Sequence, residues 1–337
     1  MSKRIVFFNH KGGVSKTTTV YNLGWKLSED SRVLVVDADP QCNLTSLILK
    51  DNFDSYYAND ETRKHNIKDG VSPAFSGRPV PIEVVDCANP TRNNSLFLLA
   101  GHGNLSEYDA SLTFAQTSSN ALTTLQNLPG SFNRLIELCE EKYNIDYTLI
   151  DLNPGLSSIN QNLFLNSDYF ILPTNPDPFS IMAIETLSLV LPRWGAWKNS
   201  SVETFSDSAY PLRNGFPKFL GVLIQRFNIR NGKAARPYQD NINEIKEVVK
   251  EKLIPKLQSA DMLAESLLLG DYCLGEIPDF GGLLPKAIDA GVPVYKLEKS
   301  DIGYTGAALK GMLEKAQSID ELFSVVSDLI IRVSADD

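Results

Sequence analysis

The sequence predicts an α/β fold in which a doubly wound, mostly parallel sheet is flanked by helices. Two observations carry this prediction. Seven apolar, strand-like runs are separated in most places by helical stretches, an alternation typical of parallel sheets. The first run leads directly into a glycine-rich turn and then a helix. The runs are Arg4–Phe8, Arg32–Asp37, Leu96–Ala100, Tyr147–Asp151, Tyr169–Pro173, Phe219–Gln225 and Leu274–Pro278.

Length and composition predict a single domain over residues 1–337. A chain of 337 residues, 43% apolar and 22% charged, can bury roughly three quarters of the surface that it exposes when unfolded. Two stretches, at about 51–90 and 194–217, are rich in loop-forming residues and interrupt the alternation, so we interpret both as insertions. A helical segment is expected at about 300–335.

Charge and cysteine content limit the classes of function. No run approaches the ~18 consecutive apolar residues of a membrane-spanning helix. The four cysteines, at positions 42, 87, 139 and 273, lack the spacing of a zinc site and are expected to be reduced, buried and structural. These features predict a cytoplasmic protein. The net charge of −9 disfavours attraction of the whole surface to nucleic acid, although a local basic patch can override it.

The turn after the first strand has the composition of a phosphate cradle. Gly12 and Gly13 let backbone N–H groups face a phosphate, and the helix that begins near Lys16 adds a partial positive charge. We expect Lys16 to bind the β- and γ-phosphates, Thr17 to bind Mg²⁺, and Thr18 to contact the α-phosphate. The predicted nucleotide-binding residues of this turn are Gly12, Gly13, Val14, Ser15, Lys16, Thr17 and Thr18.

The spacing of this turn departs from the common P-loop pattern GxxxxGK[ST]. Ser15 stands in the place of the last glycine, and a second lysine, Lys11, precedes the glycine pair. These residues resemble the deviant-Walker ATPases of the ParA/MinD family, and ParA-type partition ATPases most closely. The resemblance covers most of residues 4–50 and 145–295. It implies a P-loop NTPase that uses ATP and Mg²⁺ and hydrolyses ATP slowly, with stimulation by a partner.

Three aspartates at predicted strand ends match acidic positions of this family. The run RVLVVDADPQCNLT resembles its switch motif, which implies that Asp39 positions the attacking water and that Asp37 supports the Mg²⁺ and water shell. Asp151 ends a strand where a Walker B carboxylate lies, so it is assigned to the surroundings of the metal. With Thr17, these are the predicted metal-site residues. A turn-starting role for Asp39 and a strand-capping role for Asp151 are the alternatives.

The second lysine carries a prediction about assembly. Lys11 lies five residues before Lys16, too early in the turn to duplicate the contact of Lys16 within one subunit. In the family, the matching lysine crosses a face-to-face dimer and touches the phosphates of the partner, so ATP holds the dimer together and hydrolysis releases it. A cation supplied in trans adds roughly 10³–10⁵ in rate in related systems. The resemblance therefore assigns catalysis to Lys11, Lys16 and Asp39; a solvated loop lysine is the alternative for Lys11.

Two later segments resemble the family's base-binding elements. Gln225 ends the strand that reaches the adenine and is a candidate for base contact. Pro278 and Asp279 match the base-binding loop, although Phe280 and the glycine pair after it depart from the usual sequence.

A basic stretch predicts where DNA is bound. Four basic residues lie between positions 226 and 236 with no acidic residue among them. The family's nonspecific DNA contacts come from basic residues in comparable regions of the dimer, and such binding depends steeply on salt. A solvated loop or internal salt bridges are the alternative. The candidates are Arg226, Arg230, Lys233 and Arg236.

Three classes of function are compatible with these features. The leading one is an ATP-gated homodimer that binds nucleoid DNA nonspecifically and positions a plasmid, chromosome region or protein cargo with an adaptor protein. The second is a MinD-like membrane- or pole-associated positioning ATPase. The apolar face of the last helical segment suits it, but the acidic residues beside that face do not, so we expect that segment to pack on the domain or on a partner. The third is a metabolic or redox enzyme, which the cysteine positions and the lack of a second catalytic motif disfavour.

Overall fold

The described part of the chain is built around one seven-stranded parallel sheet. The computed structural model describes residues 2–117, 125–230, 233–234, 236–264 and 272–336. The strand order is β3-β2-β4-β1-β5-β6-β9, and each neighbouring pair is parallel. Strand β1 lies at the centre, so the turn that follows it opens at the carboxyl edge of the sheet, where ligands of such folds bind. The predicted fold class is confirmed.

The strands lie within one residue of their predicted bounds. They are apolar along their whole length because both faces of a parallel sheet are covered, which makes them easy to locate from sequence. Their bounds are β1 Lys3–Phe7, β2 Val33–Ala38, β3 Leu96–Leu99, β4 Tyr147–Leu152, β5 Tyr169–Thr174, β6 Lys218–Gln225 and β9 Cys273–Ile277, with a separate two-stranded hairpin of β7 Ile229–Arg230 and β8 Lys233–Ala234.

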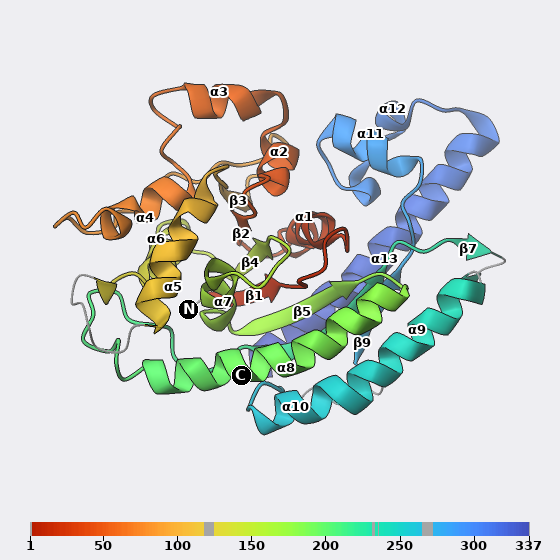
Figure 1. Cartoon of the computed structure of the whole chain (residues 1–337). Coiled ribbons are helices and arrows are strands. Elements are labelled where there is room, and N and C mark those ends of the chain that lie inside the picture. Colours follow the sequence, from red (N-terminus) through yellow and green to blue (C-terminus); the bar gives the residue numbers. More distant parts are fainter. Residues whose placement is uncertain (1, 118–124, 231–232, 235, 265–271, 337) are drawn as a thin grey trace.

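Helices follow most of these strands and return the chain across the sheet (Figure 1). The first nine helices are α1 Lys16–Leu27, α2 Asn43–Leu49, α3 Phe53–Ala58, α4 Ile67–Phe75, α5 Asp109–Thr117, α6 Ser131–Tyr143, α7 Ser158–Leu165, α8 Pro178–Ser201 and α9 Arg236–Val248. The remaining four are α10 Ile254–Ser259, α11 Leu283–Ala290, α12 Lys299–Ile302 and α13 Gly306–Asp336.

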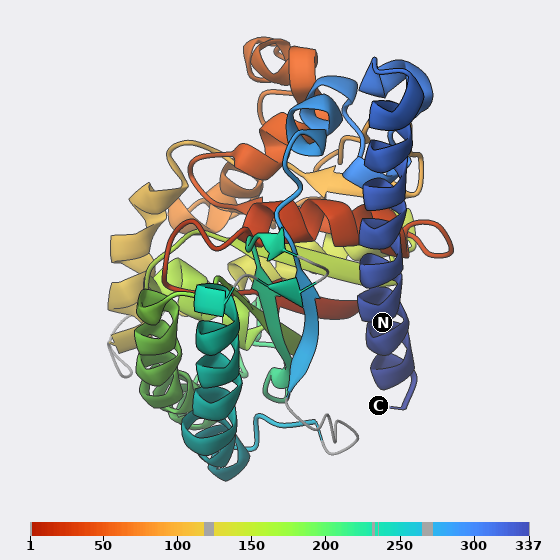
Figure 2. The same ribbon diagram turned by 90° about the vertical axis from the view of Figure 1, so that its right-hand side faces the viewer.

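Alternate residues of each strand enter two separate cores. Val6 and Phe8 pack in a core with helices α4 to α10, whereas Ile5 and Phe7 pack on the other face with α1, α2 and α11 to α13. Figure 2 shows the last helix, α13, running along one side of the molecule past α1. This three-layer arrangement fixes the carboxyl ends of the central strands, and therefore the site, from both sides.

The two irregular stretches differ in how they are folded. Residues 51–90 contain the short helices α3 and α4, followed by an extended segment that reaches helix α6, where Cys87 N–H donates to the Tyr143 hydroxyl at 3.0 Å. The second stretch begins later than predicted, because helix α8 continues from Trp194 through Ser201. Trp194 and Lys198 are buried on this helix, so its polar and aromatic residues face the core instead of forming a loop.

The last helix packs on its own domain. Ile319, Phe323 and Val326 of α13 are buried in the core that covers α1, and Lys26 Nζ of α1 lies 2.8 Å from an Asp320 carboxylate oxygen. The apolar face identified in the sequence is therefore covered by the sheet and α1. Within the described residues, no helix has the length and apolar character needed to cross a membrane.

The burial of the four cysteine side chains is unequal. Cys42 and Cys139 are buried as predicted, whereas Cys87 and Cys273 are partly exposed. Cys273 lies at the start of β9 and Cys87 in the extended segment before β3, and both pack at the edge of the core that contains α4 to α10.

Candidate nucleotide site

The turn between β1 and α1 is a preformed, strained loop. Gly13 has φ of +72° and Ser15 has φ of +61°, so two residues adopt the left-handed conformation within three positions. For Ser15 this costs about 1–2 kcal/mol because its Cβ crowds the backbone. The Ser15 carbonyl accepts hydrogen bonds from the Thr19 N–H at 2.9 Å and the Thr19 hydroxyl at 2.8 Å, which anchor the residue at the start of α1. The departure from glycine is accommodated by this strained backbone.

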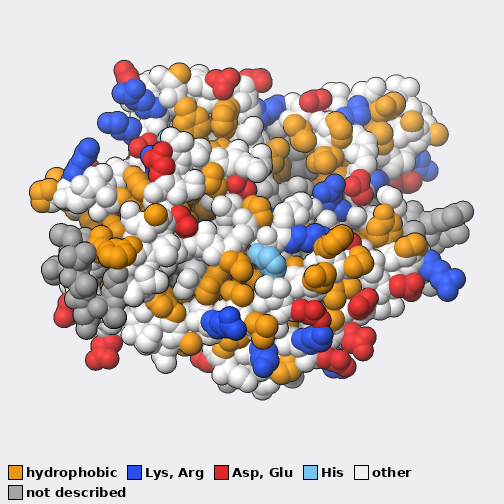
Figure 3. Space-filling model, in the orientation of Figure 1, with side chains coloured by type: hydrophobic (Ala, Val, Ile, Leu, Met, Phe, Trp, Pro, Cys, Tyr) orange, Lys and Arg blue, Asp and Glu red, His pale blue; other side chains and the backbone are white. Residues whose placement is uncertain are grey.

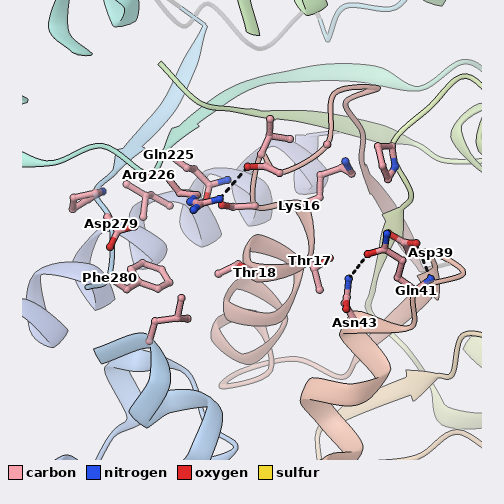
Figure 4. A pocket seen from close by; sticks show the side chains of 18 residues that line it. Lys16, Thr17, Thr18, Asp39, Gln41, Asn43, Gln225, Arg226, Asp279 and Phe280 are labelled. Atoms are coloured by element: carbon pink, nitrogen blue, oxygen red, sulfur yellow. Dashed lines mark hydrogen bonds between the residues drawn. The ribbon is translucent and has the colours of Figure 1, made fainter. Parts of the chain in front are cut away.

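The loop borders a cavity of about 470 Å³ at the carboxyl edge of the sheet (Figure 4). Ten residues predicted to bind nucleotide line it, as does Asp39. Seven further lining residues had no predicted role in binding nucleotide: Gln41, Asn43, Pro154, Arg226, Ile277, Phe280 and Leu284. The cavity therefore extends from the phosphate cradle to the loop after β9, which gives it a phosphate end and a base end.

Lys16 is placed at the floor of the phosphate end. Its side chain is buried, and Nζ donates to the carbonyl oxygens of Asn9 at 3.1 Å and Lys11 at 3.3 Å. Burial lowers the pKa of Lys16, while the charges of Asp151 and Asp39 act in the opposite direction. An anionic phosphate in the cradle would add a further stabilising charge for the protonated form.

Asp39 is the acidic residue that lines the phosphate end of the cavity. Only 7% of its surface is exposed, and one carboxylate oxygen accepts from Gln41 N–H at 2.9 Å. Gln41 in turn accepts a hydrogen bond from the Asn43 side chain at 3.1 Å, so the turn after β2 carries three polar side chains along one wall (Figure 4). Asp39 keeps an oxygen available at the position predicted for orienting water.

Asp37 lies at the same strand end, and its carboxylate is hydrogen-bonded within the chain. Its carboxylate accepts hydrogen bonds from the Thr45 N–H at 2.8 Å and the Thr45 hydroxyl at 2.7 Å, and its other oxygen accepts from Asp39 N–H at 3.2 Å. Burial raises the pKa of Asp37 to about 6, although these hydrogen bonds lower it. Asp37 holds the turn that carries Asp39 in place and, in the described structure, does not line the cavity.

Asp151 is directly opposite Asp37 in the pairing of β2 with β4. Both of its carboxylate oxygens are buried and have no hydrogen-bond partner among the described residues. Burial and the charge of Asp37 raise the pKa of Asp151 well above its usual value, while the Lys16 charge lowers it. A buried acid with unused oxygens beside Thr17 and Lys16 is suited to water molecules around a cation.

Lys11 points away from this cavity. Its Nζ lies 2.5 Å from an Asp177 carboxylate oxygen and 2.9 Å from the Ser180 hydroxyl, at the first turn of α8. Asp177 also caps that helix, because its other oxygen accepts from Ser180 N–H at 2.9 Å. The side chain of Lys11 is 22% exposed and lies outside the cavity. Lys11 and Lys16, five positions apart, therefore have separate partners.

The two polar residues predicted to read the base are already engaged within the chain. Gln225 is 2% exposed and its side-chain amide donates to the Thr19 hydroxyl at 2.6 Å. Asp279 accepts from Gly281 N–H at 2.7 Å, which holds the turn after Pro278. Both residues line the cavity, but these hydrogen bonds direct part of their polar surface into the protein.

The four basic candidates for DNA binding do not share one environment. Arg226 donates from its guanidinium to the Gly13 carbonyl at 3.2 Å and lines the cavity. Arg230 and Lys233 pair through their backbones in the β7–β8 hairpin, and their side chains lie outside the described residues. Arg236 is exposed at the start of α9. On the face shown in Figure 3, basic side chains lie at several separate places among acidic ones.

Most of the residues that form the phosphate end belong to a region that matches a known protein family. A family model described as an AAA domain, AAA_31, matches residues 2–203, which is more than half of the chain. The chain belongs to this family. The match contains the phosphate cradle, the Asp39 turn and β4 of this AAA_31 protein, and it ends before the base end of the cavity. The predicted relationship to ParA-type P-loop ATPases is confirmed.

The curated relatives of this AAA_31 ATPase include a protein with a ParA family name. A virulence plasmid ParA family protein from Chlamydia psittaci is 25% identical over 240 residues, covering 66% of this chain and 81% of the relative. An uncharacterised protein from Methanocaldococcus jannaschii is 30% identical over 180 residues, covering 53% of this chain and 61% of the relative.

Solved structures show the same fold over nearly the whole chain. The ATP complex of a McdA variant from Cyanothece has a TM-score of 0.60 at 17% identity, covering 98% of this chain and 96% of that one. The structure of pNOB8 ParA bound to nonspecific DNA has a TM-score of 0.55 at 17% identity and covers both chains completely. The fold of the AAA_31 ATPase therefore extends beyond the family match to the base end and to α13.

Proposed function

We propose that the chain is an ATP-dependent dimerising switch that binds DNA nonspecifically and positions a plasmid, chromosome region or protein cargo with an adaptor protein. The observation that carries this proposal is the opposite placement of the two loop lysines. Lys16 is buried against the cavity of its own chain, whereas Lys11 lies outside that cavity, is 22% exposed and pairs with Asp177. In the dimer, this cation would leave Asp177 and bind the nucleotide of a second subunit.

The residues at the phosphate end suit a magnesium nucleotide. No group of three or more His, Cys, Asp or Glu side chains in the described ranges could hold a metal alone. This agrees with a cation that takes most of its ligands from phosphates and water, as Mg²⁺ commonly does. Thr17 would hold Mg²⁺ through its hydroxyl, and the free oxygens of Asp151 would accept hydrogen bonds from its waters. Bound Mg²⁺ would neutralise charge on the β- and γ-phosphates.

The side chains of this chain divide the work of hydrolysis. Lys16 binds and orients the terminal phosphates, and the cradle N–H groups exclude other orientations. Asp39, held by Gln41 N–H and by the turn that Asp37 fixes, orients a water for in-line attack. The monomer lacks a positive charge at the transferred phosphate, so its hydrolysis is slow. Lys11 of a second copy supplies that charge. An adaptor that stabilises this arrangement would stimulate turnover.

DNA binding is supported by the basic residues outside the cavity and by the similarity of the fold to a DNA-bound structure. Arg236 is exposed at the start of α9, beside the hairpin that carries Arg230 and Lys233. One structural neighbour, pNOB8 ParA, is described as bound to nonspecific DNA. We therefore propose a cytoplasmic, nucleoid-associated protein. The MinD-like alternative is disfavoured because the apolar face of α13 is already buried on its own domain.

The test measures mass and DNA binding together. Wild type and Asp39→Ala are compared by light scattering and by binding to duplex DNA of unrelated sequence, each with Mg·ATP or Mg·ADP. We expect ATP-dependent dimers that bind DNA, dissociate as salt rises, and persist longer in Asp39→Ala because hydrolysis is blocked. Dimers without DNA affinity would contradict the nucleoid part of the proposal. A monomer in every nucleotide state would contradict the switch itself.

A further inference from the structure

Arg226 has an unusual backbone conformation. It directly follows β6 and has φ of +61°, in the left-handed region that residues with a side chain rarely adopt. Such a conformation costs on the order of 1–3 kcal/mol and persists where the surrounding structure imposes it, often at a ligand site.

The neighbouring structure imposes this conformation from both sides. Arg226 N–H donates to the Ile277 carbonyl at 3.0 Å, and Asp279 N–H donates to the Phe227 carbonyl at 3.0 Å. Gln225 is 2% exposed and Phe227 is 4% exposed, so the residues on either side of Arg226 are buried anchors. The loop after β9 thus holds the turn and leaves the Arg226 side chain accessible to solvent.

The side chain returns to the phosphate cradle. One guanidinium nitrogen donates to the Gly13 carbonyl at 3.2 Å, an oxygen that also accepts from the Asn175 side chain at 3.0 Å. Arg226 lines the same cavity as Phe280 and Leu284. Figure 4 shows Arg226 and Phe280 on the side of the cavity away from Asp39. The guanidinium therefore lies between the cradle and the apolar base end.

The chemistry of this position suits a flat aromatic ring. A guanidinium is planar and stacks on aromatic faces, whereas an ammonium does not. Phe280 and Leu284 supply an aromatic and an aliphatic surface on the base loop, and Leu284 is 38% exposed, which leaves it free to contact a ligand. The polar side chains of Gln225 and Asp279 already have hydrogen-bond partners within the chain. Stacking on a flat ring is therefore the main contact that this end of the cavity offers a ligand.

We propose that Arg226 binds the base of the nucleotide through its guanidinium, in a slot completed by Phe280 and Leu284, and that it does not bind DNA. This rests on the proposed function of the cavity as a nucleotide site. It reassigns one of the four basic residues of the 226–236 stretch and leaves Arg236 as a DNA-binding candidate.

The experiment compares Arg226→Ala with Arg236→Ala as the matched control. Equilibrium binding is measured for a non-hydrolysable ATP analogue and for inorganic tripolyphosphate, which has no base. We expect Arg226→Ala to lower the affinity for the analogue by roughly five- to thirty-fold, the effect of losing a guanidinium–ring contact. The affinity for tripolyphosphate should be unchanged. Arg236→Ala should leave both affinities unchanged.

A second variant separates the side chain from the strained backbone. Arg226→Gly removes the guanidinium and relieves the cost of positive φ, so it should fold at least as well as wild type and bind the analogue as weakly as Arg226→Ala. Wild-type affinity in Arg226→Gly would overturn the proposal. So would an equal loss for tripolyphosphate, because it would place the contact at the phosphates.

DNA binding at saturating nucleotide completes the test. Arg226→Ala should retain wild-type affinity for duplex DNA once the analogue is saturating, and a loss of DNA affinity with normal nucleotide binding would overturn the proposal. Failure of wild type itself to bind the analogue would instead contradict the proposed function of the cavity.

Discussion

The phosphate end and the base end of the cavity are built in different ways. The phosphate end comes from one continuous turn, residues 12–18, whose backbone groups and buried Lys16 form the cradle. The base end combines Arg226 after β6 with Phe280 and Leu284 beyond β9, two segments more than 50 residues apart in the sequence. The first end depends on local backbone geometry, and the second on side chains that tertiary structure brings together.

The largest expected effect concerns the two lysines of the phosphate end. Lys11→Ala should lower ATP hydrolysis by roughly 10³-fold or more, because the trans cation is lost, while nucleotide affinity of the monomer changes by less than about threefold. Lys16→Ala should lose nucleotide affinity itself. Single-turnover hydrolysis and equilibrium binding distinguish these outcomes. Equal loss of binding in both variants would show that Lys11 acts within its own cavity.

A stability measurement tests the burial of carboxylates at the phosphate end. The pKa of Asp37 is raised from 3.8 to about 6, so the protonated form is favoured in the folded state. Asp37 therefore contributes on the order of 3 kcal/mol to the free energy of unfolding below about pH 4, and this contribution is lost as pH rises through about 6. Asp151, whose pKa is also raised, acts in the same direction.

Asp37→Asn removes the titrating group at this position. The difference in unfolding free energy between wild type and Asp37→Asn, from chemical denaturation, should therefore shift in favour of the variant between pH 4 and about 6. Parallel pH profiles for the two proteins would contradict the raised pKa. Asp261→Asn is a control, because that residue pairs with Lys218 at the surface and lies outside the cavity.

At the base end, Phe280→Ala should affect ATP binding more than the chemical step, and it should also lower the free energy of unfolding because Phe280 is buried in the core. Loss of a stacking surface is expected to raise KM for ATP roughly tenfold with little change in kcat, since the ring does not touch the reacting phosphate. Steady-state kinetics at saturating DNA provide the measurement. Phe114→Ala, an exposed ring of α5 outside the cavity, serves as control. A fall in kcat for Phe280→Ala would mean that the two ends are coupled.

The smallest expected effect concerns the surface pair that holds Lys11. Asp177→Asn keeps an oxygen for capping α8 but removes the charge that attracts Lys11. Partly exposed ion pairs contribute about 0–1 kcal/mol, so ATP-dependent dimerisation should strengthen by no more than about fivefold. Analytical sedimentation with the non-hydrolysable ATP analogue measures the dimerisation constant. Weaker dimerisation in Asp177→Asn would show that Asp177 supports the dimer instead of holding Lys11 in the monomer.

The same difference explains what could be predicted from sequence. The strands and the cradle follow from local patterns, because buried parallel strands are apolar throughout and the turn needs particular residues in order. The length of α8 could not be predicted, since Trp194 and Lys198 are loop-like in composition but are buried in the structure. The hydrogen bonds of Asp37 with Thr45, eight residues later, could not be predicted from the sequence, and the assignment of Asp37 to the metal site stays a prediction.

Arg226 shows most clearly what sequence patterns cannot predict. In sequence it belongs to a basic stretch, and the pattern gives no sign that its side chain faces the cradle. Its direction is set by the pairing of residues 226 and 227 with the loop at 277–279, a contact made only in the folded chain. The roles of the site residues in binding and catalysis stay predictions until the variants are measured.

The contact between α1 and α13 has a consequence for biosynthesis. Lys26 and Asp320, which form an ion pair, are 294 positions apart, so the helix that follows the cradle emerges from the ribosome long before the helix that covers it. At roughly 5–20 residues per second the delay is on the order of 15–60 seconds. During that interval the apolar side of α1 lacks its cover, so a nascent chain acquires a fully packed cradle helix only near the end of translation.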